Sequence, residues 1–145
     1  PEFAPYSDFS AMPMYPFGFG LSYTQFKISN ICAEKDELSL EELKNGAEFK
    51  ITADVSNIGK HDGDEVVQLY IRDVISSMCR PVRELKGFER TSLKCGETKK
   101  AVFNLDISAF SYEIPGKGEV TERGKFEIYV GNSCTAALKI CVCII

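Results

Sequence analysis

Apolar and polar residues alternate along most of the chain after Tyr23, and this alternation predicts β-strands. In residues 49–55 every second residue is apolar and the residues between them are polar, as in a strand with one buried face. The same period of two recurs in residues 26–29, 101–107, 126–130 and 138–144. In residues 65–73 the residues that alternate with the apolar ones, which include Gln68 and Tyr70, are less polar than is usual for a solvent-facing side of a strand. This strand is therefore predicted to be covered on both faces.

Turn-forming residues separate these runs. Gly, Asn, Asp and Pro gather in residues 57–59, 61–64, 94–97, 115–118 and 131–133. Short alternating strands separated by such turns are typical of an all-β sandwich. We therefore expect an all-β, immunoglobulin-like sandwich of about seven strands.

Residues 36–46, DELSLEELKNG, do not fit the strand pattern. Ser39 and Glu42 have the spacing of a capping box, and Asn45-Gly46 would suit the end of a helix. The sequence leaves two alternatives open here, one or two helical turns or a polar loop.

The first 22 residues are predicted to be irregular, because they hold four of the six prolines together with Gly18 and Gly20. Their last part, with the residues that follow, reads YPFGFGLSYTQF from Tyr15 to Phe26. We expect residues 1–22 to form an aromatic, Pro- and Gly-rich leader and strap, and residues 23–145 to form the sandwich.

Composition and charge exclude several classes of partner. The chain has 145 residues and a formal net charge of −4, with no basic stripe, which argues against nucleic acid. The longest apolar run, residues 140–145, is far too short to span a membrane, and no signal peptide is visible. We expect neither nucleic acid nor a membrane as a partner.

The six cysteines do not show the spacing of a zinc site, and the chain has a single histidine. A disulfide framework is one alternative, but a chain of this length can bury a core without one. Free thiols are the preferred interpretation, and they favour a reducing, cytoplasmic compartment. We expect no metal and no cofactor.

Four stretches, in order, resemble the C-terminal domain of family 3 glycoside hydrolases. The first is YPFGFGLSYTQF, which is similar to the family's entry into that domain. SNIGKHDGDEVVQLYIRD (residues 56–73) and PVRELKGFERTSLKCGE (residues 81–97) resemble the segments that follow. The last is residues 106–134, so the resemblance covers nearly everything from Tyr15 onward.

The resemblance implies a fibronectin type III-like sandwich attached to catalytic domains of the same polypeptide, in a retaining β-glycosidase of β-glucosidase type. In the family, both catalytic carboxyl groups lie upstream of the segment matched here, so we expect no catalytic residue in this chain. Ser7-Asp8-Phe9 superficially resembles the family's nucleophile loop, but it lies in the wrong place. Asp62, Asp64 and Glu65 are interpreted as a solvated turn.

The aromatic stretch is the candidate interdomain contact. Aromatic side chains bury a large area with few lost rotamers, so they make good anchors between domains. The alternative is that they fold back onto the surface of the sandwich itself. The candidate contact residues are Tyr15, Pro16, Phe17, Phe19, Leu21 and Tyr23.

Three functions remain open at this point. The preferred one is a non-catalytic accessory domain that stabilises and packs against the catalytic domains. The second is an independent module that binds carbohydrate or cell wall, with Tyr70, Tyr112 and Tyr129 as candidate sugar contacts. The third is self-association through an edge strand or the aromatic stretch.

Overall fold

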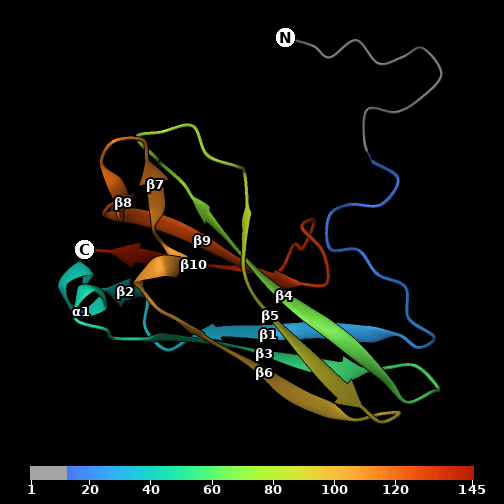
Figure 1. The fold of residues 1–145 in the computed structure, drawn as a ribbon. Helices are drawn as coiled ribbons and strands as arrows, with labels where there is room; N and C mark the ends of the chain where they lie inside the picture. The colour runs from blue at the N-terminus through green and yellow to red at the C-terminus, as the bar shows by residue number, and fades with distance from the viewer. Residues whose placement is uncertain (1–12) are drawn as a thin grey trace, which may run out of the picture.

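The computed structural model describes residues 13–145, which form two packed β-sheets and a separate hairpin (Figure 1). The smaller sheet has the order β1-β3-β6, made by β1 (Phe26–Ala33), β3 (Phe49–Asn57) and β6 (Thr98–Leu105). The larger sheet has the order β2-β10-β9-β4-β5, made by β2 (Glu37–Leu38), β10 (Lys139–Ile144), β9 (Gly124–Gly131), β4 (Gly63–Asp73) and β5 (Glu84–Leu93). The hairpin is made by β7 (Tyr112–Ile114) and β8 (Gly118–Val120).

The all-β sandwich expected from the alternation is confirmed. Within residues 13–145, and leaving aside the two-residue β2, the two main sheets hold seven strands. The alternation of apolar and polar residues did not predict β5. The pairing of β5 with β4 shifts by one residue between Leu69, which pairs with Gly87, and Tyr70, which pairs with Leu85. This irregularity interrupts the period of two. The triplet Ser7-Asp8-Phe9 and the first part of the predicted leader lie outside the described residues.

The core lies between the two main sheets. Its largest fully buried side chains come from both sheets and from the segment after β6. Phe110 and Phe126 meet edge to face, with ring centroids 5.3 Å apart. These contacts hold the larger sheet rigidly, and its outer face carries the candidate site.

The ambiguous segment around residue 40 is helical. Helix α1 (Leu40–Lys44) begins after Ser39, whose side chain accepts a hydrogen bond from the N–H of Glu42 (3.4 Å). Gly46 follows the helix with a φ of +88°, as expected for a residue that ends one. The short 3₁₀-helix η1 (Ile107–Ala109) is capped by Asp106 in a similar way.

Strand β1 contains a bulge. Its register against β3 shifts between Ser29 and Cys32, and Asn30 within the bulge has a φ of +52°. Asn is one of the few residues besides Gly that adopt this conformation readily. Its side chain is held by a hydrogen bond from Nδ2 to Oδ2 of Asp54 (2.8 Å).

A buried asparagine closes the end of the sandwich next to the N-terminal segment. Asn57, at the end of β3, is 1% exposed. Its Oδ1 accepts hydrogen bonds from Oγ1 of Thr24 (2.9 Å) and from the N–H of Gly59 (3.1 Å), and its Nδ2 donates to the carbonyl of His61 (2.8 Å). These bonds fix Thr24, and with it the point at which the N-terminal segment enters β1.

Candidate interdomain surface

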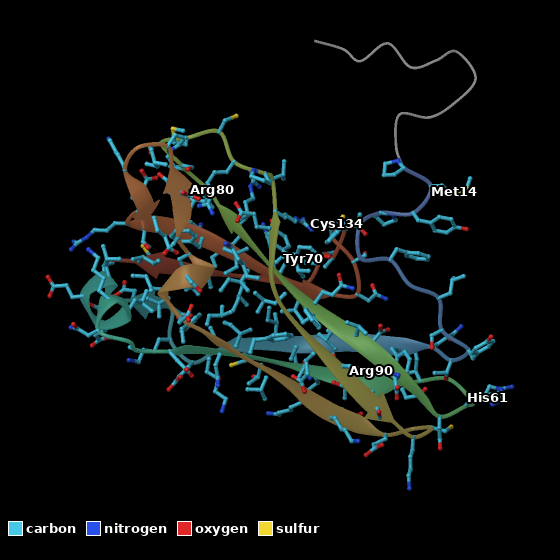
Figure 2. The ribbon with its side chains drawn as sticks, in the orientation of Figure 1. Met14, His61, Tyr70, Arg80, Arg90 and Cys134 are labelled. Carbon is cyan, nitrogen blue, oxygen red and sulfur yellow. The ribbon has the colours of Figure 1, made fainter. Side chains whose placement is uncertain are left out.

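Residues 15–23, called the strap from here on, cross the outer face of the larger sheet. The carbonyl oxygen of Phe17 accepts a hydrogen bond from the N–H of Cys134 (2.9 Å), in the turn between β9 and β10. The carbonyl oxygen of Gly18 accepts one from Nε2 of Gln68 on β4 (2.8 Å). Figure 2 shows the turn that carries Cys134 beside the chain that follows Met14. The backbone of the strap is therefore bound to the sandwich at two adjacent residues.

The close approach at Gly18 depends on the absence of a side chain. Gly18 has a φ of +81°, and a Cβ placed there would lie 2.0 Å from Oε1 of Gln68 and 2.6 Å from the hydroxyl oxygen of Tyr70. The Tyr70 hydroxyl donates to Oε1 of Gln68, so these two polar side chains are satisfied beneath the strap. Gln68 is 7% exposed and Tyr70 is 1% exposed, which confirms that β4 is covered on both faces.

Replacing Gly18 with alanine is expected to lift the strap from the sheet while leaving the core intact. The new methyl group would clash with Gln68 and would need a φ that L-residues rarely adopt. Amide hydrogen exchange at Cys134 measures the effect, because this N–H binds the strap. Gly20→Ala is the matched control, since a Cβ at Gly20 would meet nothing within 4 Å. Equal exchange at Cys134 in both variants would contradict the prediction.

The side chains of the strap point away from the sandwich. Phe17 is 66% exposed and Tyr23 is fully exposed, and Phe19 is the most covered of the large apolar side chains at 44%. Tyr15 stacks on Phe19 with ring centroids 5.3 Å apart. Pro16 is half-buried, and its carbonyl accepts the N–H of Phe19 (3.0 Å) in a tight turn. The aromatic rings thus remain available although the backbone is fixed.

The exposed apolar surface continues from the strap onto the sheet. Phe88 on β5 pairs with Gln68 on β4, so its side chain stands on the same outer face as the residue that binds the strap. Phe88 is 70% exposed, and Val66, two residues before Gln68 on that face, is 38% exposed. We define the docking surface as the strap together with Val66 and Phe88.

The three tyrosines proposed as sugar contacts do not form an exposed platform. Tyr70 lies buried under the strap, and Tyr129 on β9 is 4% exposed. The guanidinium of Arg83 covers the Tyr129 ring, with its carbon 3.6 Å from the centroid. Tyr112 is half-buried, and the guanidinium of Arg80 lies 4.6 Å from its ring centroid. A pyranose needs a free ring face, which the buried Tyr70 and Tyr129 do not offer.

A second exposed region is the loop between β4 and β5, residues 74–83, at the other end of the molecule from His61 (Figure 2). Ile75 is 82% exposed and Val82 is 73% exposed. The loop is nevertheless held firmly by Arg80, whose side chain is 10% exposed. Arg80 pairs with Asp73 (3.3 Å) and Glu84 (3.1 Å).

The strongest electrostatic cluster on the outer face is structural. Glu127 on β9 accepts hydrogen bonds from Nζ of Lys139 (2.6 Å) and from the Tyr129 hydroxyl (2.6 Å), and it pairs with Arg72 (3.3 Å). The bond from Lys139, followed by the bond from Tyr129, lowers the pKa of Glu127 to about 2. A carboxyl group with this pKa stays ionised at neutral pH, so it cannot serve as a general acid there.

The acidic residues around the start of β4 are engaged in structural contacts, and the prediction of a solvated turn was wrong for Asp64 and Glu65, which belong to the strand itself and pair with β5. Oδ1 of Asp62 accepts the N–H of Cys95 (2.8 Å), and Asp64 pairs with Arg90. In residues 13–145 no group of three or more His, Cys, Asp or Glu residues is arranged to hold a metal ion. All six cysteine thiols are free.

No helix in the described part of the chain has both the length and the apolar character needed to cross a membrane.

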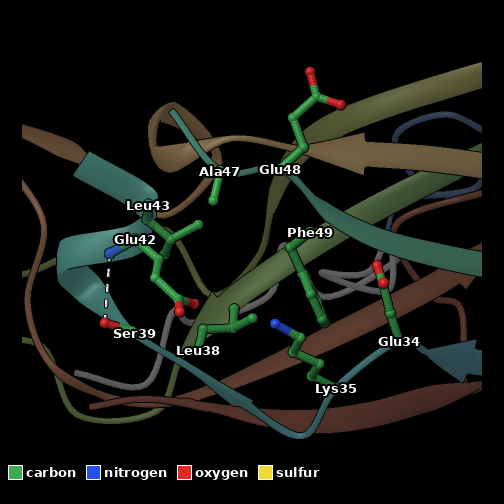
Figure 3. A pocket seen from close by; sticks show the side chains of 9 residues that line it. All are labelled: Glu34, Lys35, Leu38, Ser39, Glu42, Leu43, Ala47, Glu48 and Phe49. Atoms are coloured by element: carbon green, nitrogen blue, oxygen red, sulfur yellow. Dashed lines mark hydrogen bonds between the residues drawn. The ribbon is translucent and has the colours of Figure 1, made fainter. Parts of the chain in front are cut away.

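One further hollow lies beneath α1 and the start of β3 (Figure 3). Its floor is apolar and its rim is charged. Ser39, the one hydroxyl-bearing residue that lines it, already caps the helix. The lining residues therefore provide no activated nucleophile. They are Glu34, Lys35, Leu38, Ser39, Glu42, Leu43, Ala47, Glu48 and Phe49.

The sequence did not identify the residues that hold the strap. Gln68 and the backbone of Cys134 anchor it, and Phe88 extends its surface, yet none of these was a candidate. The one available signal was Gln68, a polar residue on a strand face that is otherwise poor in charge. The register of β5 and the position of the β9–β10 turn are tertiary features that periodicity does not contain.

Residues 65–134 match the fibronectin type III-like domain family. Among curated proteins, the chain is 44% identical over 122 residues to thermostable beta-glucosidase B of Acetivibrio thermocellus, covering 83% of this chain and 16% of that protein. It is 40% identical over 126 residues to a periplasmic beta-glucosidase of Salmonella typhimurium, covering 87% and 16%. The chain thus spans about a sixth of the length of these relatives.

Solved structures agree with the sequence match. A beta-glucosidase from Erythrobacter marinus superposes with a TM-score of 0.89 at 32% identity, over 99% of this chain and 18% of that one. A beta-glucosidase from Listeria innocua, in complex with glucose, gives a TM-score of 0.84 at 35% identity, over 97% and 19%. By sequence motifs, family match and structural likeness, the chain is a fibronectin type III-like domain of the kind found in family 3 glycoside hydrolases.

Proposed function

We propose that the chain is a non-catalytic, C-terminal accessory domain of a family 3 glycoside hydrolase. In this proposal residues 23–145 form the domain and residues 1–22 lead into it. The domain packs against the catalytic domains of the same polypeptide through the docking surface. The observation that carries the proposal is the strap, whose backbone is bound to the sheet while its aromatic side chains stand exposed.

Physical chemistry supports an interdomain role for this surface. Soluble monomers rarely expose large contiguous apolar patches, and those that do usually present a binding surface. A strap that is already fixed by hydrogen bonds loses little conformational entropy when its rings are buried. The matched part of this chain covers only 16% of each relative, so the rest of such a polypeptide could supply a partner that is covalently attached.

The catalytic centre of the parent enzyme is assigned to the rest of the polypeptide. The sequence resemblance implies that both carboxyl groups of a retaining β-glycosidase lie upstream of this domain, and the relatives named above are beta-glucosidases. The carboxyl group of Glu127, whose pKa is lowered to about 2, is engaged by Lys139, Tyr129 and Arg72. We therefore expect the chain alone to leave aryl β-glucosides intact.

Replacing Phe17 and Phe19 together with serine in the full parent polypeptide is expected to release the domain from the catalytic part. Each anchor of this kind contributes about 2 kcal/mol or more to an interface, so losing both should abolish docking. Limited proteolysis measures this, because an undocked domain is cleaved from the parent at the linker. The same pair of changes in the chain alone should leave its unfolding free energy nearly unchanged, since both rings are exposed.

Val102→Ser is the matched control. Val102 lies on β6 of the smaller sheet and is 41% exposed. This substitution therefore removes an exposed apolar side chain that is not part of the docking surface. Proteolytic release in this control to the same extent would contradict the proposal, as would hydrolysis of an aryl β-glucoside by the chain alone. A chain that dimerises in solution, and loses the dimer on Phe17→Ser and Phe19→Ser, would establish self-association instead.

A further inference from the structure

We infer that Arg83 is the positioning residue of the strap. It acts through the turn between β9 and β10, residues 132–138, against which the strap binds. This inference goes beyond the proposed function, because it concerns how the chain holds its own strap, whether or not another domain docks on it. It is drawn from three sets of contacts that meet at this turn.

The first set joins Arg83 to the turn. Its Nη1 donates hydrogen bonds to the carbonyl oxygens of Cys134 (2.7 Å) and Ala136 (2.8 Å). Its guanidinium carbon lies 3.6 Å from the centroid of the Tyr129 ring on β9. Arg83 precedes β5 in the chain, so these contacts connect the loop before β5 to the far end of β9. A charged donor shared by two carbonyl groups fixes the path of the backbone between them.

The second set joins the turn to the strap. The peptide N–H of Cys134 donates to the carbonyl oxygen of Phe17 (2.9 Å), while the carbonyl of the same residue accepts from Arg83. Cys134 is thus held from both sides, by Arg83 on one and by the strap on the other. Any change in the orientation of its backbone must alter the bond to Phe17.

The third set shows that the other anchor depends on the same turn. Nε2 of Gln68 donates both to the carbonyl oxygen of Gly18 (2.8 Å) and to that of Asn132 (3.0 Å). The turn therefore orients the amide group that binds Gly18, as well as presenting the N–H that binds Phe17. Arg83 is the charged residue that donates hydrogen bonds to the turn backbone, and its planar guanidinium also stacks on Tyr129. An arginine fits this position because it can do both. A lysine would lack the planar group that stacks on Tyr129.

Replacing Arg83 with methionine is expected to accelerate amide exchange at Cys134 about tenfold, while the amides in the middle of β4 and β9 keep their wild-type rates. Losing charge-assisted hydrogen bonds favours local opening of the turn without unfolding the core. Arg90→Met is the matched control. Arg90 also belongs to this edge of the sheet, but it is exposed and pairs only with Asp64, so Cys134 should exchange at the wild-type rate.

A second readout follows the strap directly. The chain has no tryptophan, so Phe19→Trp places a single fluorophore on the strap. Its fluorescence anisotropy is expected to fall when Arg83→Met is added and to stay constant when Arg90→Met is added. These measurements use the chain alone, so they are independent of whether a partner domain binds the strap.

Two results would overturn the inference. One is unchanged exchange at Cys134 in Arg83→Met, which would mean that the turn keeps its shape without the arginine. The other is equal acceleration at Cys134 and in the core strands, which would mean that Arg83 contributes only to global stability. If Arg83→Met does not fold, the same comparison is made with Arg83→Lys, which keeps the charge but not the stacked planar group.

Discussion

Replacing Phe126 with alanine is expected to lower the free energy of unfolding by about 3–5 kcal/mol. Phe126 is 1% exposed on the inner face of β9, and its ring meets that of Phe110, which is fully buried. Truncation removes this aromatic pair and leaves a cavity that the two packed sheets cannot easily close. Urea denaturation followed by circular dichroism measures the change, since the chain has no tryptophan.

Val102→Ala, an apolar truncation at a partly exposed position of the smaller sheet, is the control for Phe126→Ala. It is expected to change the free energy of unfolding by less than about 0.5 kcal/mol. A loss in Phe126→Ala no larger than in this control would show that the packing between the sheets does not carry the stability of the domain.

Replacing Arg80 with methionine is expected to lower the free energy of unfolding by about 3 kcal/mol at pH 7, because it leaves the buried carboxylate of Asp73 without its ion-pair partner. The side chains of Arg80 and Asp73 are 10% and 3% exposed, so water can replace little of the lost interaction. Glu84, the other partner of Arg80, keeps an ion pair with Lys86 (3.0 Å). Thermal or urea unfolding of the variant and the wild type measures the difference.

The cost of Arg80→Met should depend on pH. Burial raises the pKa of Asp73, although the Ile75 N–H and Arg80 oppose this shift. A carboxyl group whose pKa is higher in the folded state binds a proton more tightly there, so its ionisation destabilises the fold as the pH rises through that pKa. Without Arg80 the pKa of Asp73 rises further. The difference between variant and wild type is therefore largest at neutral pH and shrinks in acid as Asp73 becomes protonated.

The exposed pair of Arg90 with Asp64 is the control for the buried pair. Arg90→Met removes an ion pair of the same kind from the surface, where water screens the charges and the expected cost is much smaller than that of Arg80→Met. Adding Asp73→Asn to Arg80→Met should recover part of the loss, because no charge is then left buried. If Arg80→Met lowered the free energy of unfolding equally at pH 7 and in acid, the unpaired charge of Asp73 would not be the cause.

The strands that the sequence predicted are those whose residues face the core on one side. In β3 and β6 the apolar residues that alternate with polar ones, such as Ile51 and Phe103, are the buried ones, so the pattern of burial and the pattern of sequence coincide. Strand β5 was not predicted because Phe88 is apolar yet exposed, and because the register shift near Gly87 interrupts the alternation of buried and exposed residues. The two-residue β2 and the three-residue strands of the hairpin are too short to show a period.

The candidate surface was only half predictable. The aromatic composition of residues 15–23 predicted a contact region, which stays a prediction; the structure shows the side chains of Phe17 and Tyr23 exposed. What holds the strap in place was not visible, because backbone carbonyl groups bind Gln68 and Cys134 whatever side chains surround them. The surroundings of the three tyrosines were not visible for a related reason, since the arginines that lie over Tyr112 and Tyr129 and the strap that covers Tyr70 come from distant parts of the chain.

The bulge in β1 affects how the domain behaves when it is made without its neighbours. Strand β1 is an edge of the smaller sheet, and an open edge can recruit the same strand of another molecule and start aggregation. The turn of the backbone at Asn30 interrupts the row of free N–H and C=O groups midway along this edge. A straight incoming strand can pair with only one half of β1 at a time, which disfavours fibrous association of the chain through this edge.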